Sequence, residues 1–184
     1  MKLRPTSTQA QTSVNLAFDI ETNGIDSTYI HCVVTQNLDT GEVMEYNDQA
    51  SKNYSVVNAV CDLETADNII SHNGIMFDVP EIKKHFPFWE GKAKHWDTLI
   101  LSRFFHPNLL DIDLRRKWHK MPARLYGSHS LEAYGYRLQC YKDDFGKTTD
   151  WTDWSQEMQD YCRQDVAILT KLWTHFQKSL KALS

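Results

Sequence analysis

The sequence predicts an α/β domain built around a mixed β-sheet. Three features predict it: a segment near the N-terminus that alternates apolar and polar residues, a hairpin, and a later succession of helical and strand-like segments. A hairpin joins antiparallel strands, whereas alternating strands and helices give parallel ones, so the sheet should contain both orientations. The chain has 184 residues, of which 41% are hydrophobic, and this suffices for one domain with its own core.

The first half of the chain supplies the predicted strands. Alternation over residues 14–21 predicts a strand, and the apolar run at 29–35 forms a predicted hairpin with 42–46. Apolar residues at helical spacing over 56–63 predict a helix. A short buried strand is then expected at 68–71, followed directly by a turn.

The second half is mostly helical. Pro80 lies at an early helical position and opens a predicted helix that ends near Phe86, and another helix is expected over 97–105. Residues 106–127 are interpreted as a polar, basic connection. Ser128 is the expected cap of a helix that carries Leu131, Tyr134 and Leu138. The last helix is expected over residues 155–180.

Composition excludes several classes of protein. Lys and Arg total 20 against 24 Asp and Glu, so any surface that attracts nucleic acid must be local. No apolar stretch is long enough to span a membrane, and the polar residues 1–13 predict a flexible N-terminal arm that lacks the features of a secretory signal. The four cysteines lack zinc-finger spacing, which predicts reduced, mostly buried thiols in a cytoplasmic protein.

Carboxylates occupy positions where apolar residues belong. Asp19 and Glu21 are two residues apart on the first predicted strand and therefore share a face. Either this strand lies at an edge of the sheet with a solvated face, or a cation lies between the two acids. Asp165 lies on the apolar stripe of the last helix, where it needs either an ion pair or a metal. Asp78 follows the turn after a buried strand, either as a helix N-cap or as part of a site.

Together these acids predict metal-dependent phosphoryl chemistry. Four carboxylates without Cys or His suit a hard cation such as Mg²⁺ or Mn²⁺ better than zinc. Two such ions can activate a water and stabilise the leaving 3′-oxygen of a phosphodiester. Tyr161 lies one helical turn before Asp165, where its hydroxyl can orient that water.

Three segments resemble the exonuclease motifs of the DEDD superfamily, which have the forms D-x-E, N-x-x-x-[FY]-D and Y-x-x-x-D. They are FDIE at 18–21, HNGIMFD at 72–78 and YCRQD at 161–165. The tyrosine in the third motif is typical of the tyrosine-type branch. Further similarity, at residues 97–103, 127–138, 141–145 and 157–161, is to the N-terminal 3′–5′ proofreading domain of phage family A DNA polymerases.

The resemblance implies a ribonuclease-H-like mixed sheet flanked by helices, over an exonuclease domain at residues 14–184. It implies two divalent cations, Mg²⁺ or Mn²⁺, and release of nucleoside monophosphates from 3′ ends. The implied metal ligands are Asp19, Glu21, Asp78 and Asp165, with Asp19 shared by both ions. The remaining implied roles are water orientation by Tyr161 and contact with the terminal nucleotide by Asn73 and Phe77.

Strand binding is expected to be local and electrostatic. Basic residues alternate with aromatic ones in the segment 113–127, and this pattern suits a single strand, with cations on phosphates and rings under bases. An equally good interpretation is a solvated loop with its tryptophan packed on the body of the protein. The candidate strand-binding residues are Arg115, Arg116, Lys117, Trp118, Lys120 and Arg124.

The expected function is removal of nucleotides from single-stranded, frayed or mismatched 3′ DNA ends. The 184 residues leave no room for a polymerase domain, so we expect a stand-alone exonuclease, an excised domain, or the proofreading subunit of a separate DNA polymerase. The alternatives are an exoribonuclease of the same superfamily and a non-catalytic, polymerase-associated module. The expected location is the cytoplasm, that of the host if a phage encodes the chain.

Overall fold

A five-stranded mixed sheet forms the centre of the computed structural model, which describes residues 13–49, 54–118, 120–140 and 151–183. The strand order is β3-β2-β1-β4-β5. β1 pairs antiparallel with β2, and β2 with β3, whereas β4 is parallel to both β1 and β5. The strands are β1 (Asn15–Thr22), β2 (Ile30–Asn37), β3 (Val43–Asn47), β4 (Asn68–Ser71) and β5 (Lys94–Asp97). The predicted α/β class and mixed sheet are confirmed.

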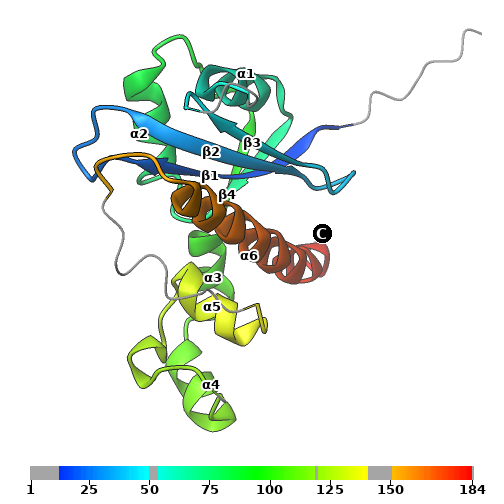
Figure 1. Cartoon of the computed structure of the whole chain (residues 1–184). Helices are drawn as coiled ribbons and strands as arrows, with labels where there is room; N and C mark the ends of the chain where they lie inside the picture. The colour runs from blue at the N-terminus through cyan, green and yellow to red at the C-terminus, as the bar shows by residue number, and fades with distance from the viewer. Residues whose placement is uncertain (1–12, 50–53, 119, 141–150, 184) are drawn as a thin grey trace, which may run out of the picture.

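Helices cover both faces of this sheet (Figure 1). Helices α1 (Val56–Thr65) and α2 (Asp78–His85) lie on one face. The long helix α6 (Gln156–Lys181) crosses the other face, where it packs on β1 and β2. Beyond α6 lie α3 (Thr98–Phe105), α5 (Leu131–Arg137) and α4 (Leu109–Arg116), of which α4 is farthest from the sheet.

The alternation along β1 divides the core into two parts. Leu16, Phe18 and Ile20 pack in the apolar cluster under α1 and α2, whereas Ala17 packs in the cluster under α6. Side chains on a strand alternate between faces, so the carboxylates two and four residues after Ala17 lie on the α6 side. β1 is the middle strand of the sheet. The alternative of an edge strand with a solvated face is therefore wrong.

Helix α6 forms where the apolar stripe predicts it. The Ser155 hydroxyl caps its first turn by accepting a hydrogen bond from the backbone N–H of Met158 at 3.1 Å. Met158, Cys162, Leu169 and Phe176 of the stripe are buried against the sheet and α5. This packing fixes which way the polar residues of α6 face.

The polar, basic connection expected at residues 106–127 is wrong, because this segment contains α4 and a short 3-10 helix, Ala123–Leu125. Leu109 is buried, and Asp113 is fully buried in an ion pair with Arg137 at 2.7 Å. A partner 24 residues away thus stabilises a helix in which half of the residues are charged.

Three further expectations need correction. The cap of α5 is Ser130, whose hydroxyl accepts from the backbone N–H of Ala133 at 3.2 Å, and not Ser128, which donates to the Ser130 hydroxyl. Strand β5 was not predicted, because its sequence KHWD lacks an apolar run. Of the four thiols, two are buried, while Cys61 is exposed and Cys140 half-buried.

Parts of two predictions lie outside the described residues. They are residues 1–12 of the expected N-terminal arm and the segment 141–145 used in the resemblance. Within the described part of the chain, no helix is both long enough and apolar enough to cross a membrane.

Candidate functional site

The candidate site forms where β1 and β4 separate. The two parallel strands pair only from Asn15 with Asn68 to Ala17 with Ile70, although β1 continues to Thr22. Beyond this point the Asp78 carboxylate, and not a residue of β4, accepts the hydrogen bond from the backbone N–H of Ile20 on β1. The carboxyl ends of parallel strands are a common place for ligand sites in α/β proteins.

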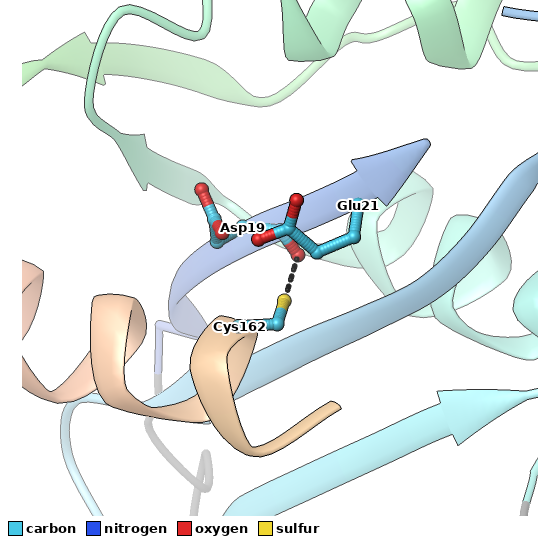
Figure 2. A group of neighbouring side chains, drawn as sticks. All are labelled: Asp19, Glu21 and Cys162. Carbon is cyan, nitrogen blue, oxygen red and sulfur yellow. Dashed lines mark hydrogen bonds between the residues drawn. The ribbon is translucent and has the colours of Figure 1, made fainter. Parts of the chain in front are cut away.

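Asp19 and Glu21 lie side by side on β1, facing the first turns of α6 (Figure 2). Both are partly exposed, and one ligand atom from each lies within 4.8 Å of the other and of the Cys162 sulfur. The Cys162 thiol is fully buried and donates to the backbone carbonyl of Asp19 at 3.4 Å. The structure therefore brings together the two acids that the sequence placed on one face.

Asp78 is a buried acid at the first position of α2, only 3% exposed. Phe77 is the residue at the N-cap, so the alternative of Asp78 as N-cap is wrong. Burial, together with the negative charges of Asp97 and Asp165, raises the pKa of Asp78 to about 7, although backbone hydrogen bonds act to lower it. Asp78 and Asp165 are thus near enough for their charges to interact, although they come from opposite sides of the sheet.

Asp165 and Tyr161 lie one turn apart on α6, as the sequence predicts. Asp165 is 7% exposed, and Tyr161 is half-buried beside it. The Tyr161 ring meets that of Trp151 edge-on, with centroids 6.0 Å apart. Trp151 and Trp154 are half-buried and pack against the core under α6.

Asp97 is a positioning residue that sequence analysis did not single out. Its buried carboxylate caps α3 by accepting the N–H of Leu99 at 2.9 Å. It also accepts the N–H of Asn73 at 3.0 Å and of Ile75 at 3.2 Å, and so holds the turn that leads to Asp78. An aspartate at the first position of a predicted helix was the signal available in the sequence.

The turn before Asp78 has little freedom. Asn73 is exposed and adopts a left-handed conformation with φ 65°. Gly74 is buried, and a Cβ atom built there would overlap the Ser71 hydroxyl and lie 3.1 Å from an Asp78 oxygen. Phe77 packs partly into the core under α1. Of the two residues expected to contact a terminal nucleotide, Asn73 is thus the more accessible.

The predicted strand-binding residues do not join the carboxylate cluster, since α4 lies far from β1 (Figure 1). The Trp118 indole donates to Asp113 at 2.8 Å and packs on a small core cluster, which favours the interpretation of a tryptophan held on the body. Arg124 pairs with Glu132 at 2.7 Å. The Arg116 guanidinium lies 5.1 Å from the centre of the Trp118 ring.

The other basic residues of the predicted set lie at the end of α4 or after it. Arg115 donates to the backbone carbonyl of Asp111 at 3.1 Å. Lys117 follows the last turn of α4 in a left-handed conformation, and Lys120 is exposed. These residues form a separate basic surface whose binding to nucleic acid stays a prediction.

Residues 16–177 match the family model of the RNase H superfamily. The chain belongs to this superfamily. Members typically depend on divalent cations, and the acidic residues of the candidate site fit such an ion. The carboxylates of Asp19 and Glu21 converge on one face of β1, and the buried carboxylates of Asp78 and Asp165 repel each other. A cation would neutralise this repulsion.

Comparison with individual proteins agrees with this assignment. The DNA-directed DNA polymerases of Escherichia phage T7 and Enterobacteria phage T3 are each 33% identical, over 84% and 85% of this chain. These matches span 25% and 26% of the polymerases, so the chain covers about a quarter of their length. Brucella melitensis NrnC with bound Mg²⁺ shares the fold, with a TM-score of 0.59 and 19% identity over 93% of this chain and 75% of NrnC. The resemblance to phage polymerase exonuclease domains is confirmed.

Proposed function

We propose that this chain is a metal-dependent 3′–5′ exonuclease that removes nucleoside monophosphates from single-stranded or frayed DNA ends. One observation carries the proposal: acids from β1, from the start of α2 and from α6 gather where β1 and β4 separate. Relatedness to phage DNA polymerases supports DNA as the substrate.

The four acids would hold two divalent cations, Mg²⁺ or Mn²⁺. Asp19, Glu21, Asp78 and Asp165 would supply carboxylate oxygens as their ligands. Bound there, the ions supply a water of lowered pKa and charge stabilisation for the leaving 3′-oxygen. Asp97 acts through the turn, since its hydrogen bonds fix the backbone that presents Asp78.

Tyr161 would orient the attacking water through its hydroxyl. Its place one turn before Asp165, with Trp151 against its ring, restricts where this hydroxyl can lie. Asn73, exposed on the turn beside Asp78, would contact the terminal nucleotide, with Phe77 behind it. A water and a 3′-terminal phosphodiester would therefore meet between α6 and this turn.

The direct test is digestion of a labelled single-stranded DNA by the full chain. We expect no cleavage in chelator, recovery with Mg²⁺ or Mn²⁺, and binding without efficient cleavage in Ca²⁺, whose looser coordination suits the chemistry poorly. A matched RNA of the same sequence is the second substrate. Faster cleavage of RNA would favour an exoribonuclease, and products from the 5′ end or from a closed circle would contradict the proposal.

The state of the DNA end should set the rate. A paired terminus must be opened, at about 1.4 kcal/mol per base-pair step, so opening two or three pairs costs roughly 3–4 kcal/mol. We expect single strands to be cleaved fastest, mismatched 3′ ends next, and matched duplexes a few hundred-fold more slowly. Equal rates on matched and mismatched ends would show that opening does not limit the reaction.

A DNA polymerase is the partner that this function would imply, because the matched relatives are DNA polymerases about four times as long as the aligned part. A pull-down with a polymerase, run beside the nuclease assay, tests it. Binding without any cleavage would favour the non-catalytic module.

A further inference from the structure

A soft ligand atom lies inside the candidate site. The Cys162 sulfur is fully buried beneath Asp19 and Glu21, and Figure 2 shows it directed from the first turns of α6 toward these two acids. Cys32 on β2 is a second buried thiol, and it makes a side-chain hydrogen bond with Cys162. The Cys162 sulfur therefore lines the candidate site, and the Cys32 sulfur lies directly behind it.

The spacing of the three ligand atoms suits coordination of one ion. Zinc takes sulfur at about 2.3 Å and carboxylate oxygen at about 2.0–2.2 Å, so tetrahedral ligands around it lie about 3.5 Å apart. The ligand atoms of Asp19, Glu21 and Cys162 all lie within 4.8 Å of one another. Side-chain shifts of roughly 1 Å or less, well within the range of a Glu rotamer, would close that difference.

The three atoms differ in their choice of metal. Oxygen ligands suit Mg²⁺ and Mn²⁺, whereas a thiolate selects softer ions such as zinc and cadmium. A sulfur held within reach of two carboxylates therefore gives thiophilic ions an interaction that Mg²⁺ does not use. The competing interpretation is a small buried residue that only fills space.

We infer that Asp19, Glu21 and Cys162 form a site for thiophilic divalent cations, with Cys162 as the residue that determines this metal preference. The inference rests on the proposed function, because it uses two of the acids assigned to the catalytic ions. When the ion binds, the metal–sulfur bond forms as the S–H bond and its hydrogen bond to the Asp19 carbonyl break, and the proton leaves to solvent. Zinc or cadmium would then compete with Mg²⁺ for Asp19 and Glu21.

The test uses Co²⁺ as a spectroscopic probe of the metal-free full chain. We expect one equivalent of Co²⁺ to produce a sulfur-to-cobalt charge-transfer band in the near ultraviolet. Cys162→Ala and Cys162→Ser should both abolish the band, and two variants guard against a fold defect in one of them. Cys61→Ser, which removes an exposed thiol, and Cys32→Ala, which removes the buried neighbour, should keep it.

Calorimetric titration with Cd²⁺ gives a second readout. Loss of the sulfur should weaken Cd²⁺ binding at least about 10–100-fold, because removal of a group that only supports a metal ligand already weakens metal binding by this amount. The effect on Mg²⁺ binding should be much smaller. Absence of the band in a wild-type protein that binds Co²⁺ would overturn the inference, as would a band that persists in Cys162→Ala. Cleavage of DNA with Mg²⁺, measured on the same preparation, tests the proposed function separately.

Discussion

Gly74→Ala tests whether the turn before α2 positions Asp78 for catalysis. The added Cβ would overlap the Ser71 hydroxyl and lie 2.6 Å from the Ser71 Cβ, against a normal carbon contact of about 3.5 Å or more. Rotating Ser71 away cannot relieve the second contact, and it breaks the hydrogen bond between Ser71 and His95. The turn must therefore move by roughly 1 Å, and Asp78 moves with it.

We expect a folded protein with about 100-fold slower turnover, because a 1 Å misplacement of a catalytic group has an effect of this size. Overpacking should cost about 1–3 kcal/mol of unfolding free energy. The assay is single-turnover cleavage of a labelled oligonucleotide with saturating Mg²⁺, alongside thermal unfolding. Adding Ser71→Gly to the variant removes both close contacts and should restore part of the rate.

The matched control is Gly41→Ala in the turn between β2 and β3. Gly41 has φ 79°, and a Cβ added there would meet nothing within 4 Å, so alanine introduces backbone strain without a clash. It should lower stability by about 1–2 kcal/mol and leave turnover unchanged. Wild-type turnover in folded Gly74→Ala would refute the role assigned to this turn.

Four further outcomes are expected. Asp165→Asn should reduce Mg²⁺-dependent turnover by at least about 1000-fold, since loss of a ligand removes several kcal/mol of transition-state stabilisation, while thermal stability holds or rises as repulsion is relieved. Tyr161→Phe should be milder, about 10–100-fold in the same assay, because only the orientation of the water is lost. Arg137→Met should cost about 3–5 kcal/mol in denaturant unfolding, because it leaves Asp113 buried without its cation. Burial favours a raised pKa for Asp113, but hydrogen bonds from Arg137, the Gly127 backbone and Trp118 outweigh it and hold the pKa below its usual value. Asp113 therefore stabilises the fold above its unfolded-state pKa, and this stability is lost as the pH falls below about 4, an effect that Asp113→Asn should remove.

Much of the site was predictable because its acids interrupt regular patterns. The alternation of β1 and the stripe of α6 each assign a face to every residue, so Asp19, Glu21 and Asp165 stand out as polar groups on faces that must be covered. Such reasoning identifies which side chains meet without any knowledge of tertiary contacts. It also predicts the central elements of the fold, because those elements carry the strongest periodicity.

What sequence analysis missed depends on contacts between distant residues. Helix α4 is too short to show a clear apolar stripe, and Asp113 is buried there because Arg137 of α5 pairs with it and Trp118 and Gly127 donate hydrogen bonds to it. Strand β5 is recognisable only through its pairing with β4. Asp97 follows from its hydrogen bonds to the turn at Asn73, which lies 24 residues earlier in the chain. Local propensity carries none of this information.

The location of the acids explains how the fold tolerates them. Because β4 separates from β1, the backbone N–H of Ile20 can donate a hydrogen bond to the Asp78 carboxylate. This hydrogen bond partly offsets the burial of the carboxylate, whose pKa is nevertheless raised to about 7. Large apolar clusters on both faces supply the stability that crowded acids remove. A divalent cation that binds only the folded chain would return part of that free energy, in proportion to the logarithm of its concentration over its dissociation constant. Under the proposed function, stability and catalysis are linked through the same four carboxylates: the concentrated negative charge that weakens the metal-free fold would also attract the catalytic ions.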